Sequence, residues 1–124
     1  MNAKETLRRL NPKALVAEEK GYVIGIEDVR DPDGRWYRVE YRSTEDGTRA
    51  TAHCLWNPWG DRNGGESYWT GHVHSNGFLC LGTKHTDQTV EKSPYSIEFV
   101  VKRSRYWCTA FSYLKEHGAF PNDA

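Results

Sequence analysis

The chain has 124 residues, of which 17 are basic and 17 acidic; 37% are hydrophobic and 13% aromatic. This length fits one domain, 1–124, which can bury a core without a disulfide or a metal. The balanced charge argues against a nucleic-acid-binding module, because such modules usually carry a net positive face. We therefore expect a protein partner and no nucleic acid.

The three cysteines, Cys54, Cys80 and Cys108, are odd in number and widely spaced. They cannot form a complete disulfide framework, so we expect a reducing, cytoplasmic setting. No apolar run reaches the roughly 20 residues that a membrane span needs, and residues 1–10 are charged and amphipathic without a hydrophobic signal core. We therefore expect no membrane partner.

The N-terminal segment predicts helix, because its apolar residues recur at helical spacing. Asn11-Pro12 suits an N-cap and a first helical position. We therefore expect helices over 5–10 and 12–20, with Gly21 as the C-cap of the second.

Three strands of an antiparallel meander are predicted next, over 22–30, 35–43 and 48–56. Aromatic and apolar residues alternate with charged ones in the second strand, which is typical of a sheet with one buried face. In the third, Ala50, Ala52, Cys54 and Trp56 share one face. Cys54 is therefore interpreted as a small buried hydrophobe.

The rest of the chain predicts a long loop over 57–67, a short strand over 68–70 and irregular structure over 82–92. Ser93-Pro94 then resembles a cap and first turn, followed by a helical apolar pattern that continues to Gly118. A break near 103–105 would divide this region into two helices. The order of elements predicts an α+β domain with helices packed on an antiparallel sheet.

Two histidines and a cysteine, His72, His74 and Cys80, lie within nine positions on either side of Asn76-Gly77. Asn-Gly favours a tight turn. A thiolate at such a position can accept an acyl group as a thioester and pass it on. His74, or Asn76, could donate a hydrogen bond to the oxyanion that forms. The alternative is a buried Cys80 with both histidines bonded into the turn.

A metal site is a second interpretation. His72 and His74 would share one face of a strand, with further ligands drawn from the rest of the chain. The candidate additional ligands are Cys80, His85, His53 and Asp87. This spacing matches no compact metal signature, and nothing specific supports a cysteine protease.

Taken together, His72-Val73-His74 and the following Asn76-Gly77-Phe78-Leu79-Cys80-Leu81 resemble the active-site motif of the ubiquitin-conjugating enzymes, and more closely their divergent bacterial relatives. The family motif runs His-Pro-Asn, a short insert, Asn-Gly, two residues and Cys-Leu. Val73 and His74 stand here where the family has proline and asparagine, and the insert is shorter.

The flanking order is similar too: an N-terminal helix, a meander, a loop with Asn57-Pro58, the cysteine, and a helix after Ser93-Pro94. The segment from Trp107 to Pro121 is similar to the Trp-containing tail of the bacterial forms. The resemblance covers most of the chain and implies a ubiquitin-conjugating-enzyme-like fold.

The resemblance also implies an activity. An activating enzyme would hand the C-terminus of a ubiquitin-like protein to Cys80, and the thioester would then pass to an amine on a protein target. No cofactor is required at this site, since ATP and magnesium act on the partner. Bacterial relatives commonly lie in anti-phage defence operons. The alternative functions are a non-catalytic variant that binds a ubiquitin-like protein and a small metal-binding domain using His72 and His74.

Individual roles follow from the same resemblance. His74 would hold the oxyanion or brace the loop in place of the family asparagine, and Asn76-Gly77 would form the turn that presents Cys80. His85 or Asp87 would orient the incoming amine. His72 is interpreted as a structural histidine.

Overall fold

The computed structural model describes residues 1–82 and 87–121. Its elements are α1 (Ala3–Leu10), β1 (Leu15–Glu19), β2 (Tyr22–Arg30), β3 (Trp36–Thr44), β4 (Ala50–Trp56), α2 (Tyr68–Gly71), the 3-10 turn η1 (Val90–Lys92) and α3 (Ile97–His117). The predicted α+β class is confirmed: an N-terminal helix, an antiparallel sheet and a C-terminal helix.

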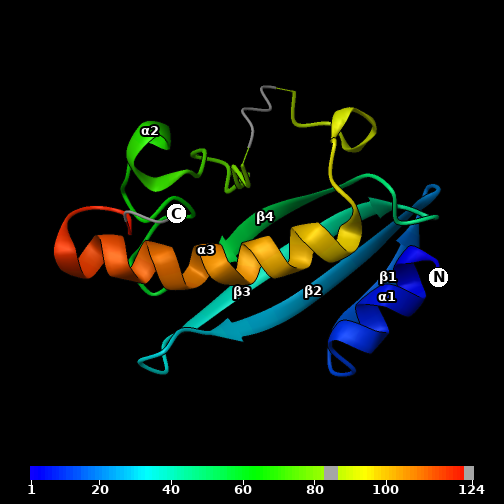
Figure 1. Ribbon diagram of the computed structural model, residues 1–124, viewed down its shortest axis with the longest axis horizontal. Helices are drawn as coiled ribbons and strands as arrows, with labels where there is room; N and C mark the ends of the chain where they lie inside the picture. Colours follow the sequence, from blue (N-terminus) through cyan, green and yellow to red (C-terminus); the bar gives the residue numbers. More distant parts are fainter. Residues whose placement is uncertain (83–86, 122–124) are drawn as a thin grey trace.

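The four strands form a meander in which every strand pairs with its neighbour along the chain, in the order β1-β2-β3-β4. Helices α1 and α3 lie against one face of this sheet, and the loop that carries α2 lies beyond the β4 edge (Figure 1). The core fills the space between sheet and helices because alternate strand residues point inward. Its largest fully buried side chains include Tyr37, Tyr41 and Phe111.

The predicted helix over 12–20 is wrong, because residues Leu15–Glu19 form β1 on the sheet edge. Lys20 and Gly21 both have positive φ values, 53° and 85°. They form a two-residue turn whose twist suits a hairpin, so Glu19 pairs with Tyr22. Gly21 is therefore a turn residue and not a helix cap. Strand pairing overrides the local helical spacing here.

The third predicted strand is correct in place, but Trp56 does not share the buried face. Ala50, Ala52 and Cys54 are buried, whereas Trp56 is 54% exposed. A register shift between Arg38 and Val39 interrupts the pairing of β3 with β4. Such a bulge reverses the side-chain alternation beyond it.

Helix α3 is one continuous helix of 21 residues, so the predicted second C-terminal helix does not form. It begins after Ser96, whose side chain accepts a hydrogen bond from the Phe99 N–H group, and it ends at Gly118 with φ 84°. Ser93-Pro94 is not its start, because the Tyr95 carbonyl accepts a bond from the Ala50 N–H group at 2.8 Å.

A buried carboxylate fastens α3 to β2. Glu27, which is 4% exposed, accepts hydrogen bonds from Arg105, Tyr41 and Asn11. Burial alone would raise the pKa of Glu27, but these three donors together hold it below its ordinary value. The network therefore fixes α3, and the residues it presents, relative to the sheet.

Within residues 1–82 and 87–121, no helix is long and apolar enough to cross a membrane.

Candidate functional site

A tight turn at residues 74–77 packs against the outer edge of β4. The His74 carbonyl accepts a bond from the Gly77 N–H group at 2.8 Å. The Gly77 carbonyl in turn accepts from the Cys54 N–H group at 2.7 Å, and the Leu79 N–H group donates to the Ala52 carbonyl at 3.0 Å. The chain leaving the turn is thus held by main-chain bonds to β4, one residue before Cys80.

The predicted turn at Asn76-Gly77 is present, and its conformation depends on both residues. Gly77 has φ 92°, and a Cβ atom there would lie 2.3 Å from the Cys54 carbonyl oxygen, so only glycine fits. The Asn76 side chain accepts a bond from the Phe78 N–H group at 3.0 Å and donates to Gln88 at 2.8 Å. Asn76 therefore stabilises the turn and its connection to the next segment.

The predicted strand over 68–70 is wrong, because these residues form the single helical turn α2. The Ser67 side chain accepts a bond from the Thr70 N–H group at 3.2 Å and begins this turn. The Trp107 indole donates to the Gly71 carbonyl at 2.9 Å and fastens its end to α3. Tyr68, at the first position of α2, is thereby directed toward Cys80.

Cys80 is the accessible one of the three thiols. It is half-buried, whereas Cys54 and Cys108 are buried, and burial raises the pKa of both of these thiols. The Tyr68 hydroxyl donates to the Cys80 sulfur at 3.4 Å. The Cys80 main chain is fixed by a 2.9 Å bond from its N–H group to the His72 carbonyl.

The hydrogen bond to Cys80, together with partial burial, raises the pKa of Tyr68 to about 12. The Tyr68 hydroxyl therefore keeps its proton at neutral pH and acts as a donor to the sulfur. A donor placed on a thiolate stabilises the charged form, which is the form that attacks an acyl carbon.

The two histidines do not share a strand face as predicted. His72 has a left-handed conformation, φ 55°, and ends α2, whereas His74 begins the turn. The His72 ring packs edge-on against Phe120 with 4.5 Å between ring centroids. The His74 ring lies 4.2 Å from the Tyr68 ring, and its Nε2 atom is buried without a hydrogen-bond partner in the described chain. The two imidazole rings therefore lie in different environments.

No group of three His, Cys, Asp or Glu side chains that could hold a metal ion occurs in the part of the chain that the structure describes. His85 lies outside the described residues. The side chain of Asp87 accepts a bond from the Thr89 N–H group at 2.9 Å and is exposed. The predicted roles of His85 and Asp87 in orienting an amine stay predictions.

Cys80 opens onto a cavity of about 480 Å³ between the α2 loop, α3 and the segment after α3. Its lining residues are His72, Cys80, Leu81, Gly82, Arg103, Tyr106, Trp107, Phe120 and Pro121. Partial burial of the ring and the nearby charge of Arg103 lower the pKa of His72 below its ordinary value. His72 is therefore a neutral imidazole at pH 7, able to accept a proton inside the cavity.

Sequence reasoning missed several residues around Cys80, above all Tyr68, which donates to its sulfur, and Arg103, which lines the cavity. No local signal marks Tyr68, because its contact with Cys80 depends on α2. A signal did exist for Arg103: together with Phe99 and Tyr106 it follows the i, i+4, i+7 spacing of one helix face, outside the apolar core stripe.

Comparison of the chain with protein-family models, with curated proteins and with solved structures found no match.

Proposed function

We propose that this protein is a ubiquitin-conjugating-like transferase that carries a ubiquitin-like protein as a thioester on Cys80 and passes it to an amine of a protein target. The observation that carries the proposal is the environment of Cys80. A single accessible thiol lies at the end of a docked turn, takes a hydrogen bond from Tyr68 and faces a cavity with room for a peptide tail and an acceptor side chain.

The order of the elements also supports the proposal. The resemblance of residues 72–81 to the ubiquitin-conjugating enzymes implies an N-terminal helix, a meander sheet, the cysteine and then a helix. The chain has α1, four antiparallel strands, Cys80 beyond β4, and α3 in this sequence. We infer a ubiquitin-conjugating-enzyme-like fold from this agreement and from the motif together.

In the first step the Cys80 thiolate attacks the thioester carbonyl carbon of the ubiquitin-like protein on its activating enzyme. The new C–S bond forms, and the bond to the sulfur of the activating enzyme breaks. Tyr68 stabilises the attacking thiolate by its hydrogen bond. The N-terminal helix, with Lys4, Arg8 and Arg9, resembles the surface that such enzymes present to an activating enzyme.

In the second step a neutral amine of the target attacks the same carbonyl carbon. The C–N bond forms, the C–S bond breaks, and Cys80 leaves as a thiolate that again accepts the Tyr68 hydrogen bond. His72, which is neutral and lines the cavity, takes the proton that the amine nitrogen loses.

His74 acts through Tyr68 in this account. Its ring packs on the Tyr68 ring and on the Phe78 ring, with centroids 4.2 and 5.7 Å apart. We assign His74 the part of a positioning residue that keeps the Tyr68 hydroxyl on the sulfur. Of the two roles that the motif implies for His74, holding the oxyanion or bracing the loop, this proposal takes the second.

The proposed setting is the cytoplasm, with an activating enzyme, a ubiquitin-like protein and a protein target as partners. Neither a metal nor an organic cofactor is assigned to the site. A role in anti-phage defence follows from the resemblance to bacterial relatives.

Reconstitution tests the proposal. The chain is incubated with ATP and with a candidate activating enzyme and its ubiquitin-like protein, and the products are separated with and without a reducing thiol. The expected result is an adduct that the thiol cleaves and that Cys80→Ala does not form. Absence of any adduct from the wild-type chain would refute the transferase. Full biological activity of Cys80→Ala would instead favour the non-catalytic binding protein.

A further inference from the structure

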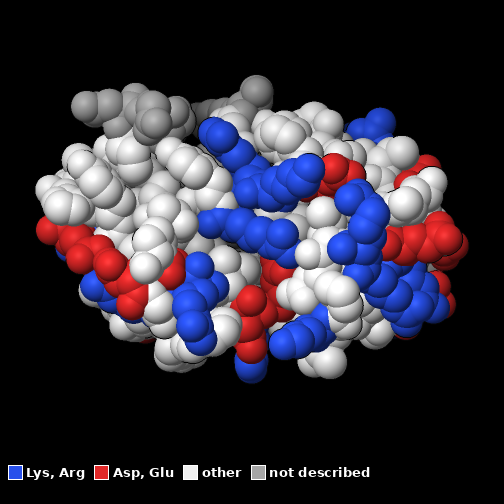
Figure 2. Space-filling view, turned by 60° about the horizontal axis from the view of Figure 1, so that its bottom comes forward, with Lys and Arg blue, Asp and Glu red and all other residues white. Residues whose placement is uncertain are grey.

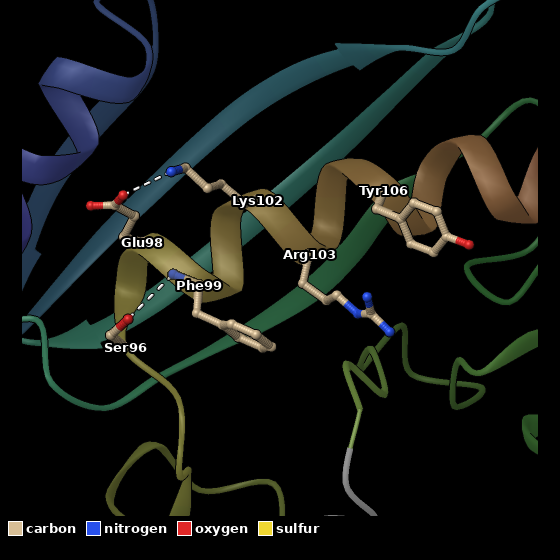
Figure 3. Close-up of a pocket in the computed structure, with 6 residues that line it drawn as sticks. All are labelled: Ser96, Glu98, Phe99, Lys102, Arg103 and Tyr106. Carbon is tan, nitrogen blue, oxygen red and sulfur yellow. Dashed lines mark hydrogen bonds and ion pairs between the residues drawn. The ribbon is translucent and has the colours of Figure 1, made fainter. Parts of the chain in front are cut away.

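Two hollows meet on the outer side of α3. The first is the Cys80 cavity; the second is a shallow groove of about 580 Å³ along the helix. The groove is lined by Ser96, Glu98, Phe99, Lys102, Arg103 and Tyr106 (Figure 3). Arg103 and Tyr106 line both hollows, so the groove leads along α3 to the thiol.

The groove is cationic. Glu98 accepts from Arg9 at 2.6 Å and from Lys102 at 2.8 Å, so one carboxylate is shared between two cations. Arg103 is the second cation that lines the groove, beside Lys102 and against the single carboxylate of Glu98. Its guanidinium lies 5.2 Å from the centroid of the Tyr106 ring, and it forms no ion pair with the residues that the structure describes. Lys and Arg side chains gather across the middle of the molecular face in Figure 2.

The end of the groove at Cys80 is also positively charged. Among the described residues that line the cavity there is an Arg and no Asp or Glu. The Tyr106 hydroxyl is buried there and has no hydrogen-bond partner in the described chain. A guanidinium beside an unused hydroxyl donor is a natural binding site for a carboxylate.

The same charge favours an amine in its reactive form. A nearby cation disfavours a second positive charge, so it lowers the pKa of an incoming ammonium group. Arg103 already has this effect on His72. A lysine alone would be repelled from the cavity, whereas a lysine that brings its own carboxylate would be held there.

We propose that the acceptor of this transferase is a lysine flanked by an acidic residue, whose carboxylate binds Arg103 and the Tyr106 hydroxyl while the lysine amine reaches the acyl group on Cys80. The inference rests on the proposed function and specifies its acceptor. The carboxylate could come from an acidic side chain or from the end of a peptide chain, and the experiment distinguishes the two sources.

The proposed step is an aminolysis of the thioester on Cys80. The lysine nitrogen gives its electron pair to the thioester carbonyl carbon, the C–S bond breaks, and Cys80 leaves as a thiolate. One N–H proton passes to His72 and then to solvent. Arg103 and Tyr106 take no part in the bond changes; they bind the carboxylate.

The test uses the full chain, acylated on Cys80 by transthiolation from a small N-acetyl-glycylglycine thioester, so no activating enzyme is needed. Single-turnover discharge is followed with three C-terminally amidated peptides whose lysine is flanked by Glu, Ala or Lys, and with the Ala peptide bearing a free C-terminal carboxylate. We expect the Glu peptide to discharge at least tenfold faster than the Ala peptide, and the Lys peptide to be the slowest. If only the peptide with a free C-terminal carboxylate discharged faster, the bound carboxylate would be that of a chain end. This result would overturn the assignment to an acidic side chain.

Reversing the charge at Arg103 then distinguishes a change in carboxylate recognition from a loss of folding. In Arg103→Glu the order of the Glu and Lys peptides should invert, whereas Arg103→Lys should keep the wild-type order with a smaller ratio. Arg30→Ala removes an exposed cation which, by the alternation of β2, lies on the side of the sheet away from the helices. It is the matched control and should keep the wild-type ratio. Equal discharge of all the peptides by acylated wild-type protein would refute the acidic acceptor while leaving the thioester itself established.

Discussion

The hydroxyl of Tyr68 donates a hydrogen bond to the sulfur of Cys80 at 3.4 Å. The two residues are 12 positions apart and come from different local structures, the one-turn helix α2 and the segment after the docked turn. Trp107 holds α2 in place, and main-chain bonds to β4 hold the turn. The environment of the thiol is therefore built by the fold around it.

Removing that hydroxyl should make the thiol less reactive. Tyr68→Phe loses a donor to a charged group, which is worth about 1.5 kcal/mol or less in this half-exposed setting, so alkylation of Cys80 by iodoacetamide at pH 7 should slow by about threefold to tenfold. Tyr113→Phe, on an exposed part of α3, is the control for loss of a tyrosine hydroxyl. Unchanged alkylation in Tyr68→Phe would show that the bond does not activate the sulfur.

Gly77 should be intolerant of any side chain. Gly77→Ala places Cβ 2.3 Å from the Cys54 carbonyl and strains a φ of 92°, so we expect the free energy of unfolding to fall by about 3 kcal/mol. Gly34→Ala is matched in φ, 86°, but has open space around it, and should cost about 1 kcal/mol. Chemical denaturation measures both. Equal losses would mean that the turn is not docked on β4.

Discharge of the thioester should depend on pH through His72. Because the pKa of His72 is lowered, the ring is neutral above its ordinary value of about 6.5 and gains its proton only in more acidic solution. The rate of discharge, corrected for the fraction of acceptor amine that is unprotonated at each pH, should therefore be lost as pH falls through a midpoint below 6.5. His72→Asn should be slower at pH 7 and should lack this acidic limb. An acidic limb that persists in His72→Asn would assign the titration to another group.

Arg105 should contribute strongly to stability because it pairs with the buried Glu27. Arg105→Ala leaves that carboxylate, 2% exposed at its side chain, with only neutral donors, and we expect a loss of about 2–3 kcal/mol from the free energy of unfolding. Glu27→Gln in the same chain removes the unpaired charge and should restore part of the loss. A double variant no more stable than Arg105→Ala would show that lost packing, and not the charge, is responsible.

Much of the fold follows from local pattern. The alternation of Tyr37, Val39 and Tyr41 with charged residues places β3 correctly, and the turns at Gly34 and Gly47 separate the strands. The segment Leu15–Glu19 could not be assigned in this way. As an edge strand it buries little, with only Val16 partly covered, so its strand conformation comes from pairing with β2.

In the candidate site, too, only the features that depend on local sequence could be predicted. Cys80 and the Asn76-Gly77 turn could be found because turn chemistry is local. Tyr68 and Arg103 could not be connected with Cys80. The Tyr68 hydrogen bond depends on the position of α2, and the cavity that Arg103 and Cys80 both line depends on how α3 packs. His74 was expected to hold the oxyanion or to brace the loop. Its ring lies on the Tyr68 ring, and its part in the reaction stays a prediction.

The most direct test of the central claim is the chemistry of the bond to Cys80, measured in Cys80→Ser with the activating enzyme, the ubiquitin-like protein and ATP. A serine oxygen in the same place should form an ester that survives a reducing thiol and is cleaved by alkali, whereas the wild-type adduct should be cleaved by the thiol. Cys108→Ala, which alters a buried thiol, should behave as wild type. An adduct in Cys80→Ser that the thiol still cleaves would place the acyl group on another cysteine and contradict the account.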